Sequence, residues 1–237
     1  MISSASNPRL KLIRKLAGRR QREKLGLFVA EGEDLVAAAL DAGLEPAEAL
    51  VDAGRPALAD RLPGVEPVEP RLLAGISTLA HPPRVLAVFR RADLPRGAEG
   101  SGLALWRVSD PGNVGTLLRA ADALGPAFAA LSPGCADLTS PKALRASAGA
   151  VFRVPTAAFD EAPRPWLALV SSEGEPLWET GDLSGTFVLG AEREGLPDDV
   201  LARCDARLAI PLEASAESLN VAVAGALALY ERRRRAR

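Results

Sequence analysis

Residues 210–231 read IPLEASAESLNVAVAGALALYE, and this stretch constrains the fold of the chain more than any other. Ser218–Tyr230 contain no charged residue, and apolar side chains fall on every side of the helix that we predict there. A helix at a protein surface shows a polar face, so this one must be covered on two sides, by a sheet and by a second subunit. Ser218 and Asn220 stand at its start, where polar side chains either cap a helix or bind a ligand.

The segments before this helix alternate between strand and helix patterns. The predicted strands are LALWRVS (103–109), FAALS (128–132), LALVSS (167–172), TFVLG (186–190) and RLAIPL (207–212). The predicted helices are NVGTLLRAADAL (113–124), PKALRASAGA (141–150) and LPDDVLARC (196–204). Strands separated by helices indicate a parallel sheet that is covered on both faces. Ligands bind beyond the carboxyl ends of such strands, where DPGN, SPGC, GAEREG and EASAESLN occur.

The N-terminal part has shorter elements of the same two kinds. Asn7-Pro8 predicts the start of a basic helix over 8–18. A strand over 25–30 and a helix over 33–43 follow, and then short strands in ALVDA, VEPV and VLAVFR. RADLPRGAEGSG, residues 91–102, has almost nothing to bury and is the predicted linker. We therefore expect a first domain over 1–90 and a second over 103–237, which should fold without the first.

Composition and charge narrow the function classes. A hydrophobic content of 48% with 25% charged residues is typical of a folded core. No apolar run is long enough to span a membrane, and no secretory signal is visible, so we expect a cytoplasmic protein. Cys135 and Cys204 are expected to be reduced thiols, and no metal-ligand spacing is present.

The net charge of −1 conceals two basic ends. The first lies within residues 1–30 and the second follows Glu231. The basic residues there are Arg9, Lys11, Arg14, Lys15, Arg19, Arg20, Arg22 and Lys24, and Arg232, Arg233, Arg234, Arg235 and Arg237. Such ends suit a bound polyanion, although a solvated helix face and a frayed tail would have the same composition.

Two further segments contain candidate functional residues. In DPGNVGTLLRAADALG (110–125), Asn113 is the predicted N-cap, and Arg119 lies opposite the apolar stripe of the helix. That arginine suits a phosphate ligand, or it is a plain surface residue. In FVLGAEREGLP (187–197), Gly190 and Gly195 bracket Glu192 and permit close approach of the backbone to a flat ligand. This loop lacks the G-x-G-x-x-G spacing of dinucleotide folds, which argues against a nucleotide-dependent oxidoreductase.

Taken in order, the three segments resemble the motifs of the SpoU/TrmH branch of the SPOUT methyltransferases. SPKALRASAGAVFRVP, residues 140–155, resembles the family's intermotif segment, and the similarity extends over about 103–231. Residues 1–90, with SSASNPRLK and FVAEGEDLV, resemble the small substrate-recognition domain that often precedes it. One departure is visible, because Leu212 stands where the third motif usually has methionine. Leucine is similar in volume, so we expect ligand binding to persist.

The resemblance implies the fold, the cofactor and the assembly. The expected fold is α/β, with a small α/β RNA-recognition domain ahead of a mostly parallel sheet that has helices on both faces. The C-terminal part of that sheet would be tied into a deep trefoil knot, which is rare among proteins. S-adenosylmethionine would be the methyl donor, held by the knotted loops without a metal. The chain would act on RNA as a homodimer, with its sites near the subunit interface.

The resemblance also assigns roles to particular residues. The implied catalytic residues are Asn113, Arg119, Glu192, Ser218 and Asn220. The implied donor contacts are Leu189, Gly190, Gly195, Ile210, Leu212, Ser218 and Leu219. The implied RNA contacts in the basic N-terminal segment are Arg9, Lys11, Arg14, Lys15, Arg19, Arg20 and Arg22.

The predicted reaction is methylation of a ribose 2′-hydroxyl in RNA. Ribosomal RNA of the large subunit is favoured over transfer RNA because of the extra N-terminal domain. Arg119 is expected to bind the target phosphate and stabilise the developing alkoxide; a guanidinium stays protonated in proteins, which disfavours its use as a base. The alternative from a different class is an RNA-binding protein without catalytic activity that uses its basic ends as a clamp.

Overall fold

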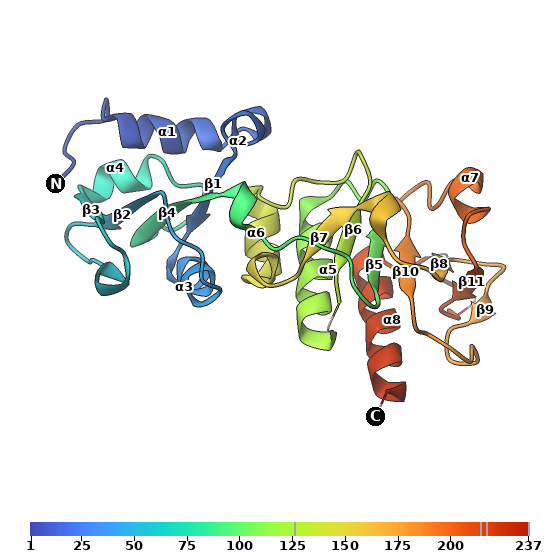
Figure 1. The fold of residues 1–237 in the computed structure, drawn as a ribbon. Coiled ribbons are helices and arrows are strands. Elements are labelled where there is room, and N and C mark those ends of the chain that lie inside the picture. The colour runs from blue at the N-terminus through green and yellow to red at the C-terminus, as the bar shows by residue number, and fades with distance from the viewer. Residues whose placement is uncertain (126, 214, 217, 237) are drawn as a thin grey trace. The chain divides into compact units, whose positions relative to one another are not determined.

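The structure is a computed structural model that describes residues 1–125, 127–213, 215–216 and 218–236. Contacts divide the chain into two compact units (Figure 1). The first unit comprises Met1–Leu94 and Asp137–Phe152, and the second comprises Pro95–Ala136 and Arg153–Arg237. Within the described residues, no helix has the length and apolar content needed to cross a membrane.

The first unit is built on a four-stranded sheet in the order β1-β4-β2-β3, in which only β2 and β3 are parallel. Its strands are β1 (Leu27–Glu31), β2 (Glu48–Asp52), β3 (Glu66–Val68) and β4 (Val85–Arg90). Its helices are α1 (Pro8–Leu16), α2 (Arg19–Leu25), α3 (Glu33–Asp41), α4 (Pro70–Ala74) and α6 (Pro141–Ser147). The predicted helix over 8–18 corresponds to α1, whereas α2 was not predicted; the chain leaves helical geometry at Gly18, between the two.

A buried ion-pair network fixes the intermotif segment within the first unit. Asp137 accepts hydrogen bonds at 2.8 Å from the guanidinium of Arg22 and at 2.9 Å from that of Arg91. The side chains of Asp137 and Arg22 are 3% and 4% exposed. Burial alone would raise the pKa of Asp137, but hydrogen bonds from Thr139 and the charge of Arg91 hold it below its ordinary value.

The contacts of residues 137–152 divide the chain differently from the predicted domains. Phe152, on the same segment, stacks on Phe28 with ring centroids 6.2 Å apart. Residues 137–152 were expected in the second domain, whereas their contacts group them with the first unit. The predicted linker is also not free chain, since Arg91 belongs to the ion-pair network and Ala98 packs in the core of the second unit. A fragment over 103–237 would leave Asp137 without its counter-ions.

The second unit contains the predicted parallel sheet. Its strand order is β7-β6-β5-β10-β8-β11-β9, and every neighbouring pair is parallel. The strands are β5 (Gly102–Leu105), β6 (Ala129–Leu131), β7 (Thr156–Ala158), β8 (Trp166–Val170), β9 (Glu175–Pro176), β10 (Thr186–Leu189) and β11 (Ala206–Ala209). The helices are α5 (Pro111–Leu124), α7 (Asp198–Leu201) and α8 (Val221–Arg235). Because all strands run the same way, their carboxyl ends meet at one edge.

Two helices cover one face of this sheet. Figure 1 shows α5 and α8 side by side, with α8 also in contact with β10. A Cβ atom on Gly225 would lie 2.4 Å from Leu117 of α5 and 3.1 Å from Leu189 of β10. Only glycine permits this close approach, so Gly225 sets the distance between α8, α5 and the sheet. On the opposite face, Phe159, Trp166 and Val200 form a separate buried cluster.

The basic C-terminal tail is engaged within the second unit. Arg233 and Arg235 donate hydrogen bonds of 2.9 Å to main-chain carbonyls of neighbouring loops. Arg234 bonds to Glu231, and hydrogen bonds from Arg234 and Arg235 lower the pKa of Glu231 to about 2. Arg237 lies outside the described residues. These side chains hold the end of α8, so they are not the frayed tail considered from the sequence.

Replacement of Asp137 tests whether the ion-pair network holds the first unit together. Asp137→Ala should lower the free energy of unfolding by about 3–5 kcal/mol, because it leaves a buried arginine without a counter-ion. Acidification should act in the same direction. Because the folded-state pKa is depressed, the contribution is present above the unfolded pKa of about 3.9 and is lost as the pH falls through the folded value.

Urea unfolding of the purified protein measures this effect. The matched control is Glu23→Ala, which removes an exposed ion pair with Arg19 whose side chains are 57% and 49% exposed. This control should cost less than about 1 kcal/mol. Equal losses in the two variants would show that the buried network contributes nothing special.

Candidate active site

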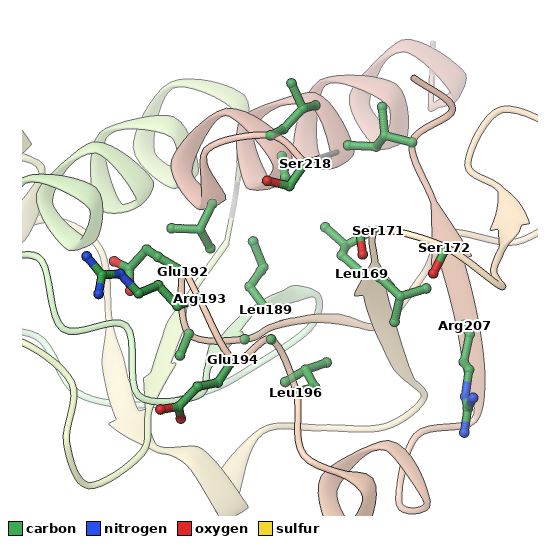
Figure 2. A pocket seen from close by; sticks show the side chains of 18 of the residues that line it. Leu169, Ser171, Ser172, Leu189, Glu192, Arg193, Glu194, Leu196, Arg207 and Ser218 are labelled. Atoms are coloured by element: carbon green, nitrogen blue, oxygen red, sulfur yellow. The ribbon is translucent and has the colours of Figure 1, made fainter. Parts of the chain in front are cut away.

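A cavity of about 400 Å³ opens at the carboxyl edge of the parallel sheet. Its walls come from the ends of β8, β10 and β11, from the loop after β10 and from the start of α8 (Figure 2). The lining residues include Leu169, Ser171, Ser172, Leu189, Gly190, Glu192, Arg193, Glu194, Gly195, Leu196, Arg207, Ile210, Leu212, Ser218 and Leu219. The volume is in the range of small-molecule sites, and leucine side chains alternate with a few polar groups, as in such sites generally.

The seven predicted donor contacts all line this one cavity. They are Leu189, Gly190, Gly195, Ile210, Leu212, Ser218 and Leu219. Their role in binding the donor stays a prediction, but segments far apart in sequence do bring them together. The sequence argument missed the wall formed by Ser171, Ser172 and Arg207, which Figure 2 shows opposite Glu192 and Arg193. LALVSS was identified as a strand, and its two serines follow the strand end, so the strand-end rule could have found them.

The loop after β10 is closed on itself. Ala191 and Gly195 exchange main-chain hydrogen bonds of 3.1 and 2.9 Å, and Gly195 has a φ of +67°. A Cβ atom on Gly190 would lie 2.2–2.5 Å from main-chain atoms of Gly195 and Leu196. We expected Gly190 to make room for a ligand; its contacts show instead that it makes room for the other side of its own loop. The tight closure presents Glu192, at the tip of the loop, to neighbouring segments.

A chain of hydrogen bonds connects the three segments singled out from the sequence. The Asn113 side-chain amide donates to Glu192 Oε1 at 3.0 Å, and the Asn220 amide donates to Asn113 Oδ1, also at 3.0 Å. The main-chain N–H of Asp110 lies 3.4 Å from the same Glu192 oxygen. Glu192 thus contacts the start of α5, and Asn113 bridges the loop and the start of α8.

The helix starts explain how these side chains are positioned. The sequence suggested Asn113 as the N-cap of α5, and this prediction is wrong. Asp110 is the cap and accepts from the Asn113 N–H at 3.0 Å, because Pro111 already suits the first helical position. Asn113 is therefore inside the first turn, and its side chain is available to Glu192. Asn220 does cap α8, accepting from the N–H groups of Ala222 and Val223.

Arg119 stands apart from this hydrogen-bond chain. It lies on the exposed side of α5, opposite the buried stripe, as predicted. Its side chain has no hydrogen bond or ion pair to any residue that the structure describes, and it does not line the cavity. Ser218 lines the cavity, whereas Asn113 and Asn220 do not. Of the five predicted catalytic residues, only Glu192 takes part in both the cavity wall and the hydrogen-bond chain.

The basic N-terminal side chains differ in their availability. Lys11, Arg14, Lys15, Arg19 and Arg20 are exposed on α1 and α2.

The other two predicted RNA contacts have partners within the first unit. Arg9 is partly buried and pairs with Glu48 and Glu66. Arg22 is 3% exposed and bound to Asp137, which rules it out as an RNA contact in this structure. Arg20 and Arg22, both on α2, therefore differ in exposure, since Arg20 is exposed and Arg22 is buried.

Comparison with protein families matches both parts of the chain. Residues 101–230 match the model of the SpoU rRNA Methylase family, and residues 7–87 match an MRM3-like substrate binding domain. The chain belongs to the SpoU rRNA methylase family. The matched range covers all three segments that build the cavity and its hydrogen-bond chain.

Individual proteins extend the similarity over the whole length. An uncharacterized tRNA/rRNA methyltransferase of Synechocystis is 34% identical over 98% of this chain and 93% of its own. The 23S rRNA (guanosine(2553)-2′-O)-methyltransferase RlmP of Bacillus subtilis is 29% identical over 98% of both chains. The solved structure of an AdoMet-bound rRNA methyltransferase from Sinorhizobium meliloti superimposes with a TM-score of 0.85 at 28% identity, covering 99% of this chain and 97% of that one.

A single methyl group at Gly190 tests whether the closed loop forms the cavity wall. Gly190→Ala should weaken binding of S-adenosylmethionine at least tenfold, because the new Cβ would force Gly195 and Leu196 to move. Titration calorimetry measures the affinity. The control is Gly181→Ala, whose Cβ would meet no atom within 4 Å and which should bind the donor like the unmodified protein. Unchanged affinity in Gly190→Ala would contradict this account of the loop.

Proposed function

We propose that this protein transfers a methyl group from S-adenosylmethionine to a ribose 2′-hydroxyl in RNA, most specifically in large-subunit ribosomal RNA. The observation that carries the proposal is the cavity at the carboxyl edge of the sheet, which residues of 187–197 and 210–231 line and whose loop wall is held by Asn113 of the remaining segment. A relative that matches over 98% of both chains is a 2′-O-methyltransferase of 23S rRNA, and another was solved with AdoMet bound.

The chemistry of the cavity fits such a donor. Leu189, Leu196 and Leu219 offer apolar surface for a flat base. Glu192, Glu194 and the serines at the ends of β8 and at the start of α8 offer acceptors for an amine and for ribose hydroxyls. When bound, the donor supplies a methyl group on a positively charged sulfur, which is a good leaving group. The protein must then mainly bind, orient and activate the acceptor hydroxyl.

The protein side chains divide this work in our proposal. Glu192, held by Asn113, fixes the loop that forms one wall of the cavity. Ser218 contacts the donor or the acceptor ribose from the opposite wall, and Asn220 keeps the start of α8 in place. Arg119 binds the phosphate of the target nucleotide and stabilises the developing negative charge on the oxygen. The exposed basic residues of α1 and α2 bind RNA beyond the target nucleotide.

We further propose that the protein acts as a homodimer through the outer face of α8. Val223, Leu227 and Tyr230 are 47%, 41% and 55% exposed and border an open groove of about 430 Å³. Exposed apolar groups arranged along one helix face are typical of a subunit interface. The apolar stripe of α5 (Val114, Leu117, Leu118 and Ala121) does not contribute to this surface, because it is buried within the chain. The trefoil knot stays part of the proposal, supported by the position of β10 between β5 and β8.

Two alternatives remain distinguishable by experiment. A transfer RNA methyltransferase would label tRNA in preference to ribosomal RNA, and an RNA-binding protein without activity would label neither. The decisive assay incubates the protein with labelled S-adenosylmethionine and unmodified ribosomal RNA, and maps the product. Label on a ribose 2′-oxygen supports the proposal; label on a base, or no transfer to any RNA, would overturn it.

Arg119 provides a test of the proposed division of labour. Arg119→Ala should lower turnover by a factor on the order of 100, as is typical for loss of an electrostatic stabiliser, with donor affinity unchanged. Stability should change by less than about 0.5 kcal/mol, since the side chain is exposed. Arg119→Lys should recover activity only in part, because lysine lacks the planar two-pronged donor. Full activity of the alanine variant would remove Arg119 from the mechanism.

The dimer is tested by a charge on the outer face of α8. Leu227→Asp should convert the protein to a monomer in sedimentation experiments at micromolar concentration, because an interface of roughly 800 Å² per partner does not accommodate an unpaired charge. The control is Leu25→Asp in the first unit, where the leucine is 42% exposed against 41% for Leu227. The control should sediment like the unmodified protein. A monomeric unmodified protein would refute this part of the proposal.

A further inference from the structure

A second, polar cavity adjoins the first. Its volume is about 590 Å³, and its walls come from the loop after β5, the start of α5, the loop after β6 and the tip of the loop after β10. The lining residues are Arg107, Ser109, Asp110, Asn113, Gly134, Ala191, Glu192, Arg193 and Glu194. Residues 191–194 line both cavities, so the two cavities meet at this short loop.

Arg107, which lines this second cavity, has an unusual backbone conformation. Its φ is +53°, the left-handed region that side chains other than glycine rarely adopt. Its N–H donates to Ser132 Oγ at 2.8 Å, which holds the main chain in this conformation. The stem of Arg107 passes beside Gly134, where a Cβ atom would lie at an ordinary contact distance of 3.4 Å from Arg107 Cγ. The main chain thus directs Arg107 into the cavity at an energetic cost.

The guanidinium of Arg107 is available to a ligand. The side chain is exposed, and it has no hydrogen bond or ion pair with the residues that the structure describes. The same holds for Arg193 on the facing loop. Two unpaired arginines at one cavity, of which one is held in a strained conformation, are not explained by the stability of the fold.

The acidic groups of the cavity are already engaged. Glu192 accepts from Asn113 and from the Asp110 N–H, and Asp110 caps α5. Their charges are directed at protein N–H groups, which leaves Glu194 as the remaining acid beside two arginines. The free hydrogen-bonding capacity of the cavity therefore consists mainly of guanidinium donors, which suit a phosphate group in geometry and charge.

We propose that the second cavity receives the acceptor nucleotide of the RNA and that Arg107 binds a phosphodiester group of its backbone. The inference rests on the proposed function. It follows from the shared lining, since residues 191–194 border both the cavity proposed for the donor and the cavity proposed for the acceptor. Arg107 is then a positioning residue, which fixes the ribose relative to the donor without taking part in the transfer.

Arg107→Gly is the most informative variant, because glycine suits the left-handed backbone better than arginine does. The substitution should leave thermal stability unchanged or raise it, and should leave the affinity for S-adenosylmethionine unchanged. The dissociation constant for unmodified 23S rRNA transcribed in vitro should rise about tenfold or more. The slope of log affinity against log salt should fall by about one, as expected for the loss of one phosphate contact.

Two further variants complete the experiment. Arg107→Lys keeps the charge and should retain the salt slope while losing part of the affinity. Arg96→Ala is the control, since Arg96 is exposed in the same unit and lines neither cavity. Its main chain pairs with Thr156 at the start of β7, away from the carboxyl ends of the strands. The control should bind the transcript like the unmodified protein.

The outcomes separate this inference from the proposed function. If Arg107→Gly binds and methylates the transcript as the unmodified protein does, the role of Arg107 is refuted and the proposed function stands. If the unmodified protein transfers no methyl group but its RNA affinity still depends on Arg107, the proposed function fails and the phosphate contact stands. Lower stability together with lower donor affinity in Arg107→Gly would show a structural role and overturn the inference.

Discussion

The arrangement of the site depends on the two hydrogen bonds that the side chain of Asn113 makes. Asn113 accepts a hydrogen bond from Asn220 and donates one to Glu192, each 3.0 Å long. The three residues come from the starts of two helices and from a strand-end loop, which are far apart in sequence. The parallel sheet brings these segments to the same edge, but loops that leave a strand end can take several paths. The two amide hydrogen bonds set their relative position, and therefore the shape of the cavity between them.

Helix α8 links this site to the rest of the second unit. Its first turn is held by Asn220, its middle approaches α5 and β10 at Gly225, and its last turn is held by arginines that bind loop carbonyls. The same helix shows Val223, Leu227 and Tyr230 on its outer face. A subunit that covers this face would stabilise the start of α8 and hence the wall of the cavity. In our proposal this accounts for the uncharged stretch of α8 that ends at Tyr230.

Much of this arrangement could be predicted from local patterns. The alternation of strands and helices predicted the parallel sheet, and the polar segments at strand ends predicted which edge carries the cavity. The uncharged stretch of the last helix predicted its packing against the sheet, which α8 shows at β10, whereas cover of its outer side stays a prediction. These features follow from periodicity and from the geometry of parallel strands, which depend on short stretches of sequence.

Other features depend on contacts between distant residues and could not be predicted. Nothing in the sequence around Arg22 distinguishes it from Arg20, and only the fold brings Asp137 against one of them. The same contact groups residues 137–152 with the first unit, a long-range grouping that linker composition does not reveal. The predicted cap, Asn113, lies three residues from the actual cap, Asp110. Both residue types cap helices well, and Pro111 selects Asp110 because proline suits the first helical position.

The central claim is that the three segments form one site through Asn113, and a double-mutant cycle tests it most directly. Glu192 and Asn220 are not hydrogen-bonded to each other, so any coupling between them must pass through shared partners. Glu192→Ala, Asn220→Ala and the double variant would be compared in methyl transfer to ribosomal RNA at saturating donor. The cost of the lost helix cap appears on both sides of the cycle and cancels. The account predicts an interaction free energy above about 0.5 kcal/mol, and additive effects of the two substitutions would contradict it.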